Sequence, residues 1–143
     1  MPFGSYHADP AEAVRNATRF LKEAGAEAVK IEGARPELAA RLVAAEIPVV
    51  AHLGLLPQGV HRMGGYKVQA RTLDAAEALV ADALAMEAAG AALVVLEGVP
   101  REVAARITQT LQVPVIGIGA APGSAHRRQA LHRYRLPVPA ASA

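Results

Sequence analysis

The chain contains no cysteine and no tryptophan, and its aromatic residues are three tyrosines and two phenylalanines. Without cysteine it can form neither a disulfide nor a thiolate metal site, which fits the reducing cytoplasm. Its longest uncharged apolar run, residues 88–96, is far shorter than the roughly 20 residues that a membrane-spanning helix needs. The first ten residues lack the basic and apolar regions of a signal peptide. We therefore expect a soluble cytoplasmic protein with no membrane partner.

Acidic residues are missing from the last part of the chain. From residue 121 onward there are four arginines, Arg127, Arg128, Arg133 and Arg135, and no aspartate or glutamate. Of the 15 basic residues in the whole chain, 11 remain outside this part, against 13 acidic ones, so residues 1–120 carry a net charge of −2. The overall positive charge thus belongs to a basic tail, and we do not expect the rest of the chain to bind nucleic acid.

What the chain does have is a regular alternation of helical and extended segments. Strands are predicted over residues 28–32, 49–53, 93–97 and 113–119. Helices are predicted over residues 10–24, 36–45, 72–89 and 100–111, and a long loop separates the second strand from the third of these helices. Asp9 followed by Pro10, and Gly25 after the last turn, are typical signals for the two ends of the first helix.

This alternation indicates βαβ units and a parallel sheet. Four such units are half of a (β/α)₈ barrel and too few to close one. We therefore predict an α/β fold that is a partial TIM barrel over residues 1–120, followed by the basic, proline- and alanine-rich tail over residues 121–143.

Three of the predicted strands end in a polar residue that is followed by glycine, immediately or one residue later. They read Val29-Lys30-Ile31-Glu32-Gly33, Val50-Ala51-His52-Leu53-Gly54 and Val95-Leu96-Glu97-Gly98. Strands that are buried on both faces are normally almost entirely hydrophobic, and polar groups are costly to bury unless they bind a metal or a substrate. Because ligands bind at the carboxyl ends of strands in such folds, this edge of the sheet is the candidate site.

Each of these residues suits a particular chemistry. Lys30 and Glu32 lie two apart on one strand and share a face, so the carboxylate could coordinate Mg²⁺ and the lysine could neutralise substrate charge. The alternative is an ion pair within the strand. Glu97, at the end of an apolar strand, is suited to act as a general base, or else it is a surface carboxylate that caps the helix at Pro100. His52 could be an acid, an orienting residue or a ligand, or simply a hydrogen-bonded histidine.

Several stretches together resemble the ketopantoate hydroxymethyltransferase family. They are VKIEG (29–33), AHLGLLPQ (51–58), GGYKVQARTLDAA (64–76), DALAMEAAGAALVVLEGVP (82–100) and PVIGIGA (114–120), and their order and spacing also fit the family over about residues 1–120. The resemblance implies a (β/α)₈ barrel of the phosphoenolpyruvate mutase and isocitrate lyase superfamily. In that fold this chain would supply about four βα units, without the first three strands and the last.

The family resemblance also implies an activity and roles for the strand-end residues. The family transfers a hydroxymethyl group from 5,10-methylenetetrahydrofolate to 3-methyl-2-oxobutanoate, giving 2-dehydropantoate for pantothenate biosynthesis, with Mg²⁺ as cofactor and in homo-oligomers that are decamers. By resemblance, Glu32 matches a metal-site glutamate, Lys30 a substrate-binding lysine, Glu97 the general base and His52 an active-site histidine.

Two other functions remain open at this point. One is another Mg²⁺-dependent carbon–carbon lyase of 2-oxo acids from the same superfamily. The other is a remnant or assembly subunit without catalytic activity.

The sequence departs from the family pattern at both ends. The family's two metal-site aspartates belong to segments that would precede Pro2, and Ala121 replaces a glycine that the family follows with an Asp-Gly-Gln motif. We therefore expect impaired activity from this chain alone, and we hypothesise an internal start together with a frameshift after Gly119.

Sequencing the locus tests this hypothesis. We expect codons for family-like strands upstream of Met1, and a family-like peptide in another reading frame after Gly119. A stop codon directly upstream, together with no such peptide downstream, would contradict it.

Overall fold

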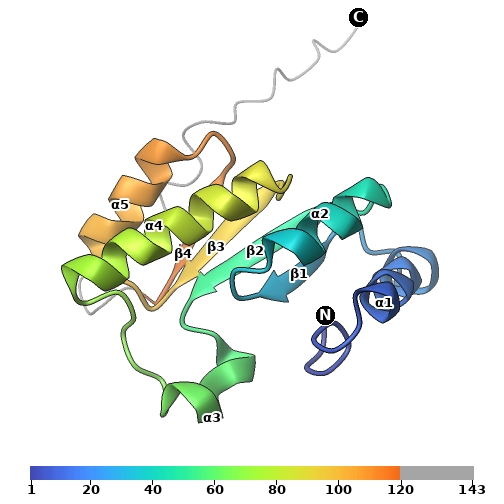
Figure 1. The fold of residues 1–143 in the computed structure, drawn as a ribbon, viewed down its shortest axis with the longest axis horizontal. Helices are drawn as coiled ribbons and strands as arrows, with labels where there is room; N and C mark the ends of the chain where they lie inside the picture. The colour runs from blue at the N-terminus through green and yellow to red at the C-terminus, as the bar shows by residue number, and fades with distance from the viewer. Residues whose placement is uncertain (120–143) are drawn as a thin grey trace, which may run out of the picture.

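Figure 1 shows the computed structural model, which describes residues 1–119. Every strand and helix predicted from the sequence is present, with bounds that agree within two residues. The elements in chain order are α1 (Pro10–Ala24), β1 (Val29–Glu32), α2 (Pro36–Ala44), β2 (Val49–Gly54), η1 (Pro57–Gly59), α3 (Val60–Met63), α4 (Leu73–Ala88), β3 (Leu93–Glu97), α5 (Arg101–Thr110) and β4 (Val115–Ile118). The predicted tail, residues 121–143, lies outside the described residues.

The helix ends follow from local hydrogen bonds. Asp9 accepts a hydrogen bond from Ala11 N (2.9 Å) at the start of α1, and Gly25 ends that helix with a φ of 66°. Thr72 caps α4 by accepting from Ala75 N at 3.3 Å. The connection after β2 differs from the predicted loop, because it contains the 3₁₀ turn η1 and the four-residue helix α3. Elements of this length are too short to show a hydrophobic period in the sequence.

The four strands form one parallel sheet in the order β1-β2-β3-β4. In the register, Glu32 lies opposite His52, and Gly54 lies opposite Glu97. The prediction of βαβ units with a parallel sheet is thus confirmed, and the fold is an α/β arrangement consistent with part of a TIM barrel.

One face of the sheet forms the hydrophobic core with the helices. Helices α2, α4 and α5 lie on this side (Figure 1), and they contact β2 and β4. Ile31, Ala51, Val94 and Leu96 point into this layer, and none of them is more than 1% exposed. Full burial of a side chain such as Ile31 contributes about 1.5–3 kcal/mol to folding, so this layer holds the strands in place.

The opposite face of the sheet is much more exposed. Ile116 and Ile118 on β4 point to this side and are 42% and 45% exposed. In a closed barrel this face would point inward, which explains why it carries apolar side chains. Because side chains alternate along a strand, the same face carries Glu32, His52 and Glu97. The fold therefore places the candidate residues at the carboxyl end of the barrel-interior face.

The close approach of β2 and β3 at Gly54 yields a test of the fold. A Cβ atom at Gly54, where φ is 86°, would lie 2.3 Å from Glu97 O and 2.7 Å from Val99 Cγ1. We expect Gly54→Ala to lower the free energy of unfolding by about 2–5 kcal/mol, because a strained φ and a steric clash both contribute. Gly4 has a similar φ of 88° with no atom within 4 Å, so Gly4→Ala is the matched control and should cost only about 1–2 kcal/mol. Equal losses in urea unfolding would contradict the close approach.

Candidate active site

The carboxyl ends of β1, β2 and β3 bring three of the four candidate residues together. Glu32 and His52 are neighbours across the β1–β2 pair, and Nε2 of His52 lies 3.2 Å from Oε2 of Glu97 on β3. His52 is 1% exposed and Glu32 is 8% exposed, and apart from Tyr6 they are the only buried residues with ionisable side chains among residues 1–119. Two such groups side by side at the end of a parallel sheet form a polar site within an otherwise apolar layer.

The different surroundings of its two ring nitrogens determine how His52 can act. Its Nε2 is 2.9 Å from the carbonyl oxygen of Leu55, which can only accept a hydrogen bond, so Nε2 carries the proton. Nδ1 is then a lone-pair acceptor, and it is fully buried without a hydrogen-bond partner in the described part of the chain. Because buried polar atoms are nearly always paired, Nδ1 is suited to accept a hydrogen bond from a bound molecule. His52 is thus hydrogen-bonded, as the simpler interpretation held, but only through one of its two nitrogens.

Glycines allow the backbone to fold over the strand ends. Gly33, Gly54 and Gly98 follow the polar strand-end residues, and all three have positive φ angles, of 85°, 86° and 58°. After Gly54 the chain turns toward β3, and Leu55 N donates a hydrogen bond to Glu97 O at 2.7 Å. The carbonyl of Leu55 thereby comes to face His52. This explains why a polar residue and a glycine occur together in the sequence pattern.

Glu97 is neither fully buried nor a surface carboxylate that caps the following helix. Its side chain is 22% exposed, and its carboxylate lies beside His52. It does not cap α5, since that helix begins at Arg101 without a side-chain hydrogen bond at its amino end. A carboxylate that is partly removed from water and still reachable from solvent is suited to take a proton from a bound substrate.

Glu32 is held by the segment that follows β2. Its Oε2 accepts a hydrogen bond from Gln58 N at 3.0 Å, and its own N–H donates to the hydroxyl of Tyr6 at 3.1 Å. Neither Tyr6 nor Gln58 was predicted from the sequence, because neither belongs to a chemical motif or follows a strand end. The one available signal was that Gln58 closes the stretch AHLGLLPQ.

Lys30 lies on the same face of β1 as Glu32 but is exposed. Within residues 1–119 its ammonium group forms no ion pair or hydrogen bond, so the ion pair within the strand that the sequence allowed is not formed there. Its backbone carbonyl accepts a hydrogen bond from the amino group of Met1 at 2.7 Å. The structure therefore does not join Lys30 to the cluster of Glu32, His52 and Glu97.

The described residues supply only part of what a metal site needs. Among residues 1–119 no group of three or more histidine, aspartate or glutamate side chains is placed to hold a metal ion. Glu32 alone fits, because one of its oxygens is held by Gln58 and no hydrogen bond within this range reaches the other. Mg²⁺ is commonly bound by one or two carboxylates, with water and substrate oxygens completing its coordination. Glu32 can thus supply one ligand, and the described residues do not complete a site.

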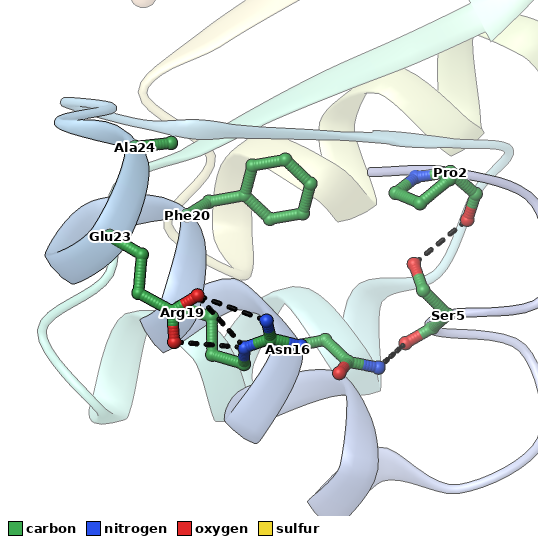
Figure 2. A pocket seen from close by; sticks show the side chains of 7 residues that line it. All are labelled: Pro2, Ser5, Asn16, Arg19, Phe20, Glu23 and Ala24. Atoms are coloured by element: carbon green, nitrogen blue, oxygen red, sulfur yellow. Dashed lines mark hydrogen bonds and ion pairs between the residues drawn. The ribbon is translucent and has the colours of Figure 1, made fainter.

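Two cavities formed by the described residues lie away from the strand ends. One cavity of about 300 Å³ lies between the amino-terminal segment and α1 (Figure 2), and its lining consists of Pro2, Ser5, Asn16, Arg19, Phe20, Glu23 and Ala24. The side chains in it are already paired, since Arg19 contacts Glu23 at 2.9 Å and Asn16 donates to Ser5 O at 2.8 Å. A second cavity of about 390 Å³ lies beside Tyr6 and Arg35. Neither of these two cavities includes Lys30, Glu32, His52 or Glu97, so the candidate site is identified here by its buried polar groups.

Comparison with known proteins gives a consistent match. The family model described as ketopantoate hydroxymethyltransferase matches residues 1–131. Three curated relatives, all named 3-methyl-2-oxobutanoate hydroxymethyltransferase, illustrate the similarity. The protein of Koribacter versatilis is 60% identical over 124 residues, which are 85% of this chain and 42% of the relative. That of Frankia alni is 58% identical over 123 residues (84% and 40%), and that of Gloeobacter violaceus is 53% identical over 125 residues (85% and 48%). The chain therefore spans less than half the length of these relatives.

The tautomer of His52 is directly measurable. Because the carbonyl of Leu55 requires a donor at Nε2, we expect long-range ¹⁵N–¹H NMR spectra of the neutral ring to show the proton on Nε2 and none on Nδ1. The exposed His61 is the internal reference and should show rapidly exchanging tautomers. A protonated Nδ1 with a bare Nε2 at His52 would contradict the geometry.

Proposed function

Because the chain belongs to the ketopantoate hydroxymethyltransferase family, we propose that its strand-end cluster is part of a site that transfers a hydroxymethyl group from 5,10-methylenetetrahydrofolate to 3-methyl-2-oxobutanoate. The product would be 2-dehydropantoate, a precursor in pantothenate biosynthesis. The observation that carries the proposal is the contact of the buried His52 with the partly exposed Glu97 at the carboxyl end of the parallel sheet. The comparisons favour this transferase over a carbon–carbon lyase of the same superfamily.

Glu97 is the proposed general base. Its carboxylate would remove the proton from C3 of 3-methyl-2-oxobutanoate, and the electron pair of that C–H bond would form the enolate of the 2-oxo group. Water would release the one-carbon unit from 5,10-methylenetetrahydrofolate as formaldehyde, with both C–N bonds broken and tetrahydrofolate as the leaving group. C3 of the enolate would then add to the formaldehyde carbon as its C=O π bond opens, and the resulting alkoxide would take up the proton held by Glu97 to become the hydroxymethyl group. The N–H of Nε2 is fixed by the carbonyl of Leu55, and Nε2 lies 3.2 Å from Oε2 of Glu97, so the imidazole ring is held beside the carboxylate before the substrate arrives.

Glu32 and Lys30 have proposed roles in binding the anionic substrate. A Mg²⁺ ion held at this edge would supply Lewis-acid chemistry that makes the C3 proton of a 2-oxo acid more acidic. Glu32 would supply one oxygen ligand to that ion, and Lys30 would balance the negative charge of the substrate.

The family resemblance and the open sheet face support assembly with further chains. We infer a homo-oligomer, which is a decamer in the intact family. The exposed Ile116 and Ile118 on the sheet, and Phe3 near the amino terminus, are apolar surface that an interface would cover. None of the helices in residues 1–119 has the length and apolar character that crossing a membrane requires.

The enolisation step tests Glu97 separately from folate chemistry. In D₂O with Mg²⁺, the full chain should catalyse exchange of the C3 proton of 3-methyl-2-oxobutanoate for deuterium, which ¹H NMR follows directly. Glu97→Gln, which keeps the shape but removes the base, should slow this exchange by about 10²–10⁴-fold. Turnover of the complete reaction should stay low, because the described residues supply only one carboxylate for the metal.

Glu102→Gln is the matched control, since Glu102 is exposed on the nearby helix α5. It should exchange the C3 proton at the wild-type rate. No exchange by the wild-type chain, or exchange that Glu97→Gln leaves unchanged, would argue against the proposed base. Cleavage of a 2-oxo acid into two smaller carbonyl compounds would instead support the lyase alternative.

A further inference from the structure

The carboxylate of Glu32 is held by a closed set of hydrogen bonds that joins three parts of the chain. The set includes the amino-terminal segment, strand β1 and the turn η1, which lie far apart in the sequence. Gln58 N donates to Glu32 Oε2 at 3.0 Å, and Glu32 N donates to the hydroxyl of Tyr6 at 3.1 Å. The same hydroxyl donates to Oε1 of Gln58 at 2.9 Å, so Tyr6 and Gln58 both contact Glu32 and each other.

Each member of this set is fixed by further contacts. Tyr6 is 3% exposed, and the guanidinium carbon of Arg35 lies 5.6 Å above the centre of its ring. The hydroxyl of Tyr6 is the donor in its bond to Gln58, because the amide oxygen of Gln58 can only accept. The other end of the Gln58 amide donates to the carbonyl oxygen of Met1 at 2.9 Å. Both ends of the Gln58 side-chain amide are thus hydrogen-bonded, so its side chain cannot rotate freely. Its backbone N–H is held toward Glu32.

We infer that Tyr6 and Gln58 are positioning residues that hold the carboxylate of Glu32 in the orientation in which its second oxygen can coordinate a divalent cation. The inference rests on the proposed role of Glu32 as a magnesium ligand. It assigns a function to the amino-terminal segment and to η1, neither of which contributes a residue to the reaction itself. Partners that orient a metal ligand commonly change metal affinity by 10–100-fold when they are removed.

The geometry favours positioning over a purely structural role. Here the phenol of Tyr6 accepts from the backbone of Glu32 and donates to the side chain of Gln58, whose backbone N–H binds Oε2. Removing the hydroxyl should therefore affect both the backbone and the carboxylate of Glu32.

Tyr6→Phe in the full chain removes only the hydroxyl and keeps the buried ring. In the metal-free protein we expect the three-bond couplings of the Glu32 side chain to show averaging over rotamers, and the Gln58 amide hydrogen to exchange faster. Titration with Mg²⁺, followed through the Glu32 carboxyl ¹³C resonance, should give an affinity lower by roughly tenfold. Tyr66→Phe is the matched control, because Tyr66 is 74% exposed, and it should match the wild type in all three measurements.

Gln58→Met provides a second variant if Tyr6→Phe does not fold. It keeps the backbone N–H but removes both side-chain bonds, so it should loosen Glu32 in the same way. The inference is wrong if, in both folded variants, the Glu32 side-chain couplings and the exchange rate of the backbone amide hydrogen at position 58 equal those of the wild type. It is also wrong if only the Glu32 amide responds, since that result describes a structural hydrogen bond. If the Glu32 carboxyl resonance of the wild-type protein does not shift when Mg²⁺ is added, the proposed role of Glu32 as a metal ligand is refuted instead. The side-chain couplings measured without metal would still decide whether Tyr6 and Gln58 position Glu32.

Discussion

The backbone of Leu55 is the point on which the candidate site depends. Its N–H donates to the carbonyl of Glu97, and its own carbonyl accepts from Nε2 of His52. One residue thus ties the end of β2 to the end of β3 and fixes the proton on the histidine ring. Gly54 is required for this approach, because a Cβ there would lie 2.3 Å from Glu97 O, and a Cβ at Gly98 would make a tight contact of 3.1 Å with Leu55 Cβ. The chemistry of the strand ends therefore follows from the close approach of two backbones.

Burial imposes a second constraint on this edge of the sheet. Helices α2, α4 and α5 cover one face of the strands, and the other face carries the polar ends together with exposed isoleucines. Polar groups on such a face need partners, because an unpaired buried donor or acceptor costs about 1–3 kcal/mol. Glu32 finds its partners in Tyr6 and Gln58, and His52 finds one in Leu55. Among residues 1–119, Nδ1 of His52 is a fully buried acceptor without a partner, so a bound molecule could complete its pairing.

Most of the fold could be predicted from the sequence, because its signals are local. Asp9, Gly25 and Thr72 mark helix ends through bonds to their near neighbours, and the apolar runs identify all four strands. The site was predictable only in outline. The sequence places Glu32, His52 and Glu97 at strand ends, but it cannot show that Leu55 orients His52, since that bond depends on the turn after Gly54. Tyr6 was missed for a similar reason: it lies 26 residues from Glu32, and only the folded chain brings them together. The short helix α3 gave no periodic signal at all.

The central claim is that Glu32, His52 and Glu97 form one binding site at the end of the sheet. Its most direct test is an NMR titration of the full chain with 3-methyl-2-oxobutanoate in the presence of Mg²⁺, followed through the carboxyl ¹³C signals of glutamate and the ring ¹⁵N signals of histidine. The account predicts that Glu32, Glu97 and Nδ1 of His52 shift together along one binding curve, while Glu23, which is paired with Arg19 on α1, does not move. Shifts confined to other residues, or separate binding curves for the three groups, would contradict it.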